Sequence, residues 1–107
     1  MYSKFHHRGL EVLAYPCNQF GNQEPGTDEQ IRQFAALHHF PGHLMRKVDV
    51  NGPNAEPAWT FLKEQGGGGD VKWNFEKFLV DRSGKPVRRY GSPFDTRAIE
   101  ADLEALL

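Results

Sequence analysis

The feature that most constrains the fold of this chain is an apolar run, Leu10–Tyr15, that stops at a proline. Glu11 is the only polar residue of the run, which is too few for a strand with one wet face, so the run predicts a strand buried on both faces. Pro16 ends that strand, and a loop rich in amide side chains follows it. The polar residues of this loop are Cys17, Asn18, Gln19, Asn22 and Gln23. Because α/β proteins usually carry their chemistry beyond the carboxyl end of a strand, we expect the functional site in this loop.

The size and charge of the chain exclude several classes of protein. Its 107 residues predict a single domain, residues 1–107, that buries about two-thirds of the surface of the unfolded chain. The 13 Lys and Arg are dispersed and balanced by 14 Asp and Glu, so neither nucleic acid nor an anionic membrane is expected as a partner. No apolar run is long enough to span a membrane. One cysteine cannot form an internal disulfide, which fits either a reducing compartment or a free thiol. The cytoplasm is the location that we expect.

The beginning of the chain has the pattern of a helix end. Met1 and Phe5 share a helical face, His6–Arg8 suit the negative C-terminal end of a helix, and Gly9 suits a left-handed cap. No N-cap residue precedes them. We therefore expect that the chain lacks its natural N-terminus or begins at an internal methionine.

Two helices and a strand are predicted over residues 27–69. Thr27 begins a capping box at the start of a helix that stops at Phe40. A strand is expected over Leu44–Val50, and the next helix holds Pro57 in its first turn and ends at Gly66–Gly69. The residues expected on the apolar face of the first of these helices are Ile31, Phe34, Ala35 and His38.

A hairpin and a last helix are predicted over residues 73–107. Trp73–Val80 is expected to be a strand covered on both faces, and the turn Asp81–Gly84 leads into an edge strand, Pro86–Tyr90. Asp95 or Thr96 caps the last helix. The order of these elements predicts the α/β class with a small mixed sheet.

Three blocks of the sequence together resemble the glutathione peroxidase family. They are LAYPCNQFGNQEPG (Leu13–Gly26), KVDVNG (Lys47–Gly52) and KWNFEKFLVDRSGKPVRRYG (Lys72–Gly91), in the family's order. The resemblance implies a thioredoxin-like fold without its N-terminal strand and without the loop that carries the peroxidatic cysteine or selenocysteine. In that fold the missing strand lies inside the sheet, so we expect the chain alone to be marginally stable or to pair with another chain.

The resemblance also implies a site. Gln23, Trp73 and Asn74 match three residues that surround the family's nucleophile, which has no counterpart in this chain. Amide and indole N–H groups can stabilise a thiolate and the charge that develops on a leaving oxygen. Without the resemblance, each residue has a structural interpretation: a loop amide bonded to backbone, a core tryptophan and a strand-end asparagine. Only the joint match favours catalysis.

Cys17 lies within the signature but matches a common non-peroxidatic cysteine of the family. No Lys, Arg or His lies within five residues of it in the sequence to depress its pKa. A buried, small, apolar side chain is therefore the favoured interpretation of this residue.

The implied function is the thiol-dependent reduction of hydrogen peroxide and of organic or lipid hydroperoxides, a defence against oxidative stress that needs no bound cofactor. Near Ala36 or Leu37, where thioredoxin-using members carry a resolving cysteine, this chain has none, so glutathione or a similar thiol is the expected reductant. The short connection through Gly66–Gly69 resembles that of monomeric members, which include enzymes acting on lipid hydroperoxides, and a monomer is expected for the full-length enzyme. The alternative is a non-catalytic thioredoxin-like remnant or binding module.

Other charged or glycine-rich groups point to no further chemistry. The five histidines have no recognised metal-binding spacing, so no metal site is predicted. The run Gly66–Gly69 lacks a phosphate-binding pattern, and Lys85, Arg88 and Arg89 are expected to form an exposed edge.

Overall fold

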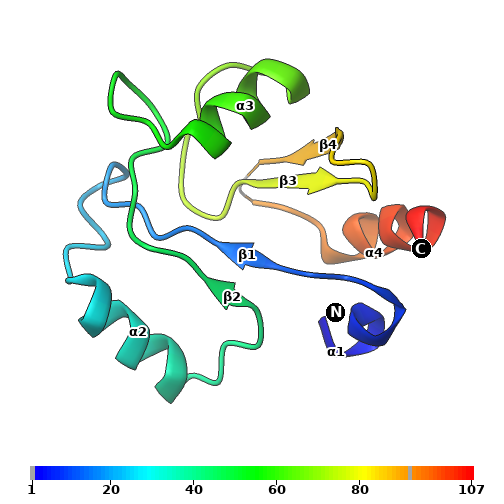
Figure 1. Cartoon of the computed structure of the whole chain (residues 1–107), viewed down its shortest axis with the longest axis horizontal. Coiled ribbons are helices and arrows are strands. Elements are labelled where there is room, and N and C mark those ends of the chain that lie inside the picture. Colours follow the sequence, from blue (N-terminus) through cyan, green and yellow to red (C-terminus); the bar gives the residue numbers. More distant parts are fainter. Residues whose placement is uncertain (1, 92) are drawn as a thin grey trace. The chain divides into compact units, whose positions relative to one another are not determined.

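A computed structural model of the chain describes residues 2–91 and 93–107 (Figure 1). The chain divides into two compact units. The first unit comprises Met1–Pro16, Pro25–Lys47 and Asp95–Leu107, and the second comprises Cys17–Glu24 and Val48–Phe94. Because segments of the two units alternate along the sequence, they are not consecutive domains, and the single domain 1–107 stays a prediction.

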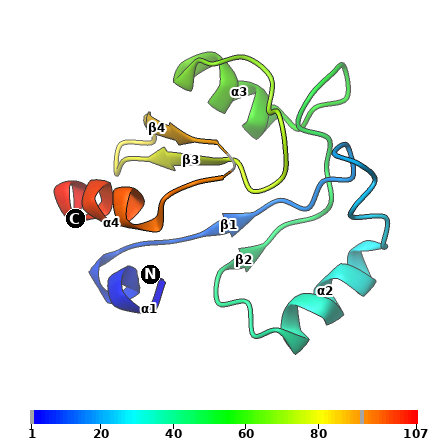
Figure 2. The same cartoon turned by 180° about the vertical axis from the view of Figure 1, so that it is seen from behind.

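The first unit contains a short parallel sheet of two strands, β1 (Leu13–Ala14) and β2 (His43–Leu44), which lie side by side in Figures 1 and 2. Around the sheet, His43 N donates to Val12 O over 2.7 Å, and Met45 N donates to Ala14 O over 2.8 Å. The strand predicted at Leu10–Tyr15 therefore exists but is much shorter. Leu13 is 53% exposed, so the prediction that the strand is buried on both faces is wrong. A sheet of two strands, each two residues long, offers too little surface to be covered on both faces.

The first helical segment comprises α1 (Tyr2–Phe5) and a 3-10 helix, His6–Arg8. Gly9 closes it with a φ of 107°, which confirms the predicted left-handed cap. Phe5 is fully buried. Met1, which the sequence places on the same helical face, lies outside the described residues.

Helix α2 (Asp28–Leu37) begins with the predicted capping box. Gln30 N donates to Thr27 Oγ1 over 3.2 Å, and Thr27 N donates to Gln30 Oε1 over 2.9 Å. Of the expected apolar face, Ile31 is buried, whereas Phe34 is 65% exposed, so the fold covers only part of that face. Periodicity gives the side of a helix on which a residue lies, but neighbouring elements decide how much of that side they cover.

Helix α4 (Thr96–Leu106) completes the first unit. Asp95 caps it, because its Oδ1 accepts a hydrogen bond from Arg97 N over 2.9 Å. Of the apolar residues of α4 that fall at helical spacing, Ile99 and Leu103 are buried, whereas Leu106 is 37% exposed.

The second unit packs helix α3 (Pro57–Gly66) beside a hairpin of β3 (Lys77–Val80) and β4 (Pro86–Tyr90), as both views show (Figures 1 and 2). The strands are antiparallel, which confirms the predicted hairpin. The ring of Trp59 in α3 contacts the ring of Phe78 edge-on, with centroids 5.8 Å apart.

Two predicted strands in this part of the sequence are shorter than expected. The strand expected from Trp73 begins only at Lys77, because Phe75 has a φ of 65° and interrupts the extended backbone. The strand expected over Leu44–Val50 pairs only at β2 and at an isolated bridge between Asp49 and Ala55. Each unit thus holds one sheet of two strands instead of the single mixed sheet that the order of elements predicted. Among the described residues, no helix has the length and apolar character needed to cross a membrane.

Candidate active site

Two of the three predicted site residues bind each other in the second unit. Asn74 Nδ2 donates a hydrogen bond to Gln23 Oε1 over 2.8 Å, although the two residues are 51 positions apart in the sequence. This bond uses one N–H of Asn74 and leaves its other N–H and the NH2 group of Gln23 as donors. We call Gln23 and Asn74 the amide pair.

The loop that carries Gln23 is closed by a hydrogen bond from Glu24 N to Asn18 Oδ1 over 2.9 Å. Gly21 and Asn22 both have positive φ angles, 66° and 52°, so the chain turns sharply just before Gln23. A Cβ atom on Gly21 would lie 3.2 Å from the ring of Trp73, closer than almost all Cβ contacts. Glycine therefore meets two requirements here, the backbone conformation and the space beside the indole.

Asn74 is followed by a residue in a strained conformation. Phe75 has a φ of 65°, which is rare for a bulky side chain, and its side chain is 73% exposed. Lys77 Nζ donates to Phe75 O over 2.7 Å and lies 3.5 Å from the centre of the Phe94 ring. Burial lowers the pKa of Lys77 from its ordinary value. These contacts hold the turn in which Asn74 lies.

Trp73, the third predicted site residue, lies at the surface of the second unit. Its side chain is 45% exposed, so the interpretation of Trp73 as a core residue does not apply. Its ring meets the buried ring of Phe20 edge-on, with centroids 6.0 Å apart. Trp73 therefore borders the loop of Gln23 and precedes Asn74 in the chain, so all three predicted residues lie in one region of the second unit.

The chemistry available in this region is hydrogen-bond donation by uncharged groups. Amide and indole N–H groups can stabilise a negative charge by donating hydrogen bonds while they themselves stay uncharged. Among residues 2–91 and 93–107, no group of three or more His, Cys, Asp or Glu side chains is arranged to hold a metal ion. The catalytic assignment of Gln23, Trp73 and Asn74 stays a prediction.

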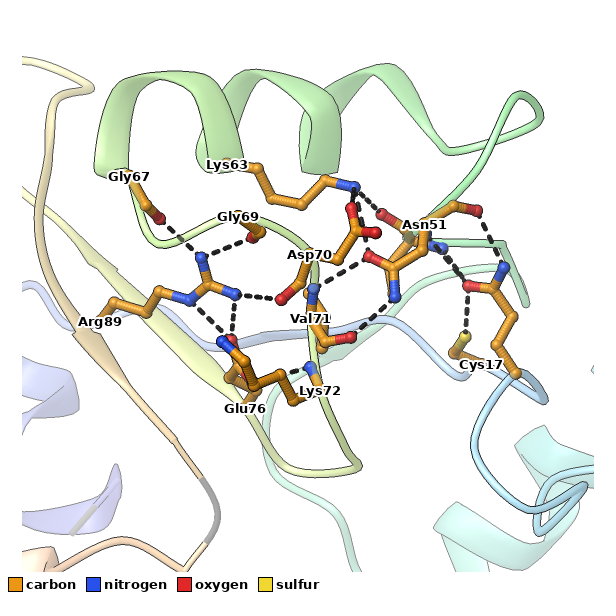
Figure 3. A network of polar contacts seen from close by, with 12 residues as sticks. Cys17, Asn51, Lys63, Gly67, Gly69, Asp70, Val71, Lys72, Glu76 and Arg89 are labelled. Atoms are coloured by element: carbon orange, nitrogen blue, oxygen red, sulfur yellow. Dashed lines mark hydrogen bonds and ion pairs between the residues drawn. The ribbon is translucent and has the colours of Figure 1, made fainter.

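A polar network not predicted from the sequence surrounds Asn51 and Val71 (Figure 3). Asn51 Nδ2 donates to Val71 O over 2.7 Å, and Val71 N donates to Asn51 Oδ1 over 2.9 Å. Gln19 Nε2 donates to Asn51 O over 2.9 Å, while Gln19 Oε1 accepts from Val50 N and Asn51 N. The only sequence signals for this network were the amide-rich loop and the turn at Asn51, and neither indicates a partner.

Cys17 belongs to the edge of this network. Its thiol lies 3.4 Å from Gln19 Oε1, to which it donates, and the side chain is partly exposed. The interpretation of Cys17 as a buried apolar side chain is therefore wrong, because its sulfur faces a polar group that already binds backbone.

A second group of contacts fixes the glycine-rich turn after α3. Arg89 donates to the carbonyl oxygens of Gly67 (2.6 Å), Gly69 (2.8 Å) and Asp70 (3.0 Å), and its Nε donates to Glu76 Oε1 over 2.6 Å (Figure 3). The side chains of Arg89 and Glu76 are only 15% and 6% exposed. The expectation that Arg89 lies on an exposed edge is therefore wrong, because its guanidinium points into the turn. It holds the segment that leads to Trp73 and Asn74.

Comparison with known proteins identifies the family. The model of the family described as glutathione peroxidase matches residues 1–63. The chain belongs to the glutathione peroxidase family. A chloroplastic phospholipid hydroperoxide glutathione peroxidase of Pisum sativum is 54% identical over 113 residues, which are all of this chain and 47% of the relative.

Two further relatives extend the comparison. The hydroperoxy fatty acid reductase gpx1 of Synechocystis is 49% identical over all of this chain and 69% of its own length. The crystal structure of T. cruzi GPX1 matches 98% of this chain and 65% of its own with a TM-score of 0.73 and 36% identity. The predicted thioredoxin-like α/β fold is thus confirmed. The chain spans about half the length of the Pisum relative. That it holds only part of the family's domain stays a prediction.

Proposed function

We propose that the protein reduces hydroperoxides at the expense of a thiol, with lipid hydroperoxides among its substrates. The observation that carries this proposal is the hydrogen bond of the amide pair, which joins two residues from distant parts of the chain that match donors of the family's site. Membership of the glutathione peroxidase family supports the reaction type. The names of the Pisum and Synechocystis relatives, which refer to phospholipid hydroperoxide and hydroperoxy fatty acid, support the substrate class.

The reaction consumes one hydroperoxide and two thiols and forms an alcohol, water and a disulfide. A thiolate or selenolate attacks the terminal peroxide oxygen, the O–O bond breaks, and the alkoxide leaves with a proton as the alcohol. The resulting sulfenic or selenenic acid condenses with one thiol and releases water. A second thiol then attacks the mixed disulfide and restores the nucleophile. The N–H groups of the amide pair and of Trp73 act in the first step, where they stabilise the anionic nucleophile and the leaving oxygen.

The reductant that we propose is glutathione or a similar small thiol, in preference to thioredoxin. Its support is the sequence near Ala36 and Leu37, which contains no cysteine to form an internal disulfide. The protein acts as a monomer and uses no prosthetic group in this proposal.

The decisive assay measures peroxide consumption by the natural polypeptide, whose intact mass is determined first. The substrates are hydrogen peroxide, cumene hydroperoxide and a phospholipid hydroperoxide, each with glutathione or with a thioredoxin system. Faster turnover with glutathione supports the proposed reductant, whereas faster turnover with thioredoxin contradicts it. A polypeptide without any turnover contradicts the proposed function and favours the non-catalytic alternative.

The variant Cys17→Ser tests in the same assay whether Cys17 is the nucleophile. Cys17 is the only cysteine among these 107 residues, and its thiol contacts Gln19. We expect unchanged turnover, because Cys17 matches the family's non-peroxidatic position. Loss of turnover in Cys17→Ser, with the fold intact by circular dichroism, would instead assign the reaction to this sulfur.

A further inference from the structure

The side chain of Asn51 binds Val71 as a neighbouring β-strand would. It donates to the carbonyl and accepts from the N–H of the same residue, over 2.7 and 2.9 Å (Figure 3). Val71 is only 5% exposed, and backbone groups in such surroundings need hydrogen-bond partners. One side chain thus satisfies both backbone groups of a buried residue that lies three positions before Asn74.

Gln19 holds the backbone of Asn51 in the same way. Its Oε1 accepts from Val50 N over 2.8 Å and from Asn51 N over 3.1 Å, and its Nε2 donates to Asn51 O over 2.9 Å. Gln19 lies four positions before Gln23. The two side chains therefore join the segment that carries Gln23 to the segment that carries Asn74, with residues 50 and 51 between them.

Lys63 of α3 orients the carboxamide of Asn51. Its Nζ donates to Val50 O over 2.5 Å, to Asn51 Oδ1 over 3.2 Å and to Asp70 Oδ1 over 3.4 Å, and its side chain is 13% exposed. An ammonium group can only donate hydrogen bonds, so the carboxamide of Asn51 must point its oxygen toward Lys63. Its NH2 group then points toward the carbonyl of Val71. The orientation of Asn51 is thus determined by charge as well as by its backbone partners.

We propose that Asn51 and Gln19 are positioning residues that set the distance between the two members of the amide pair. Neither side chain bonds to Gln23 or Asn74, so their effect on the pair passes through the backbone of the two segments. The catalytic consequence of this inference rests on the proposed function, but the geometric consequence does not. Asn51 then affects peroxide reduction through the placement of donors and leaves thiol or peroxide binding unchanged.

The geometric consequence is tested by NMR on the ¹⁵N-labelled natural polypeptide. Asn51→Ala removes both bonds to Val71, and the matched control Asn54→Ala changes an exposed asparagine of the same loop. We expect Asn51→Ala to shift the side-chain amide signals of Gln23 and Asn74 and the indole signal of Trp73, whereas Asn54→Ala leaves all three in place. Unshifted signals in Asn51→Ala, or equal shifts in both variants, would overturn the proposal.

Two milder variants decide the question if Asn51→Ala does not fold. Asn51→Asp keeps the acceptor for Val71 N, and Gln19→Glu keeps the acceptor for Val50 N and Asn51 N. Each replaces the donor to one carbonyl, Val71 O or Asn51 O, with a negatively charged oxygen. Both are expected to shift the same three signals by smaller amounts, while the backbone signals of α2 stay in place. If both variants leave the three signals unshifted, the proposal is wrong.

The catalytic consequence is tested by steady-state kinetics on the natural polypeptide. Because small errors in the placement of donors reduce rates strongly, Asn51→Ala should lower kcat by about 10- to 100-fold. The KM values for peroxide and thiol should change less than about twofold, since the variant removes no group that contacts them. A higher KM with unchanged kcat would overturn the positioning role. An inactive wild-type protein would contradict the proposed function alone, because the NMR shifts do not depend on turnover.

Discussion

The ion pairs of the two units differ in how much water surrounds them. In the first unit Arg8 and Glu104 form a 3.0 Å pair with side chains 35% and 50% exposed. In the second unit Arg89 and Glu76 are 15% and 6% exposed, and Arg89 also binds three backbone carbonyls. Exposed pairs contribute little to stability, whereas a shielded charge that loses its partner is strongly unfavourable. Both units contain buried apolar residues. We infer that, beyond these, single polar side chains fix the loop conformations of the second unit, whereas capped helices stabilise the first.

The largest effect is expected for Arg89→Ala, which tests this contrast directly. The variant leaves the carboxylate of Glu76 shielded and without its guanidinium partner, so the free energy of unfolding should fall by about 3–5 kcal/mol. Urea titration followed by circular dichroism measures the change. In the first unit, Arg8→Ala should lower the same quantity by less than about 1 kcal/mol. Similar losses in the two variants would remove the contrast.

The exposed control in the same strand is Arg88→Ala. The side chain of Arg88 is exposed and donates to Val87 O over 2.8 Å, the carbonyl of its own neighbour. Its removal should change the unfolding free energy by no more than about 0.5 kcal/mol. A loss as large as that of Arg89→Ala would mean that the strand β4, and not the guanidinium in the turn, is the sensitive feature.

A smaller effect is expected in the first unit for Thr27→Ala. The variant removes the Oγ1 acceptor of Gln30 N at the start of α2, and the loss of such an N-cap lowers stability by about 1 kcal/mol. Thermal unfolding measures the effect, and Thr27→Ser, which keeps the acceptor, should restore most of it. A loss equal to that of Arg89→Ala would show that local capping matters in the first unit as much as the shielded ion pair does in the second.

The smallest effect is expected for Asp81→Asn, in the turn between β3 and β4. The hydroxyl of Ser83, followed by the backbone N–H of Lys85, holds the pKa of Asp81 below its ordinary value of 3.8. Because the pKa of Asp81 is lower in the folded state than 3.8, the ionised carboxylate stabilises the folded turn fully above pH 3.8. This contribution is lost as the pH falls through the lowered pKa.

The thermal midpoint of Asp81→Asn, measured at two pH values, tests this sign. The variant should unfold below the wild type at about pH 7, by less than Thr27→Ala, and the difference should shrink as the pH falls below 3.8 toward the lowered pKa of Asp81. A difference that grows toward low pH would contradict the assignment.

Features encoded by neighbouring residues were predictable from the sequence. The capping box at Thr27, the left-handed Gly9, the cap at Asp95 and the hairpin turn at Asp81 each depend on residues within four positions. Their hydrogen bonds are formed within the same turn, so no knowledge of distant segments is needed.

Features that depend on distant segments were missed or overstated. The bonds of Asn51 to Val71 span 20 positions, and those of Gln19 to the backbone of residues 50 and 51 span 31 and 32. An asparagine in a turn signals only that turn, because its carboxamide can bind any backbone group that tertiary structure brings near. The strand at Leu10–Tyr15 was predicted too long for the same reason, because the length over which a strand pairs depends on the neighbouring strands that the fold supplies. The site was predicted through the family resemblance, and local patterns alone had favoured structural interpretations for Gln23, Trp73 and Asn74.

The separation of 51 residues between Gln23 and Asn74 has a consequence during translation. Chain synthesis at about 5–20 residues per second puts roughly 3–10 s between the two residues leaving the ribosome. During that interval Gln23 lacks Asn74 as its partner. The amide pair therefore cannot form in the first seconds after Gln23 emerges, so nascent chains hold Gln23 before the site around it exists.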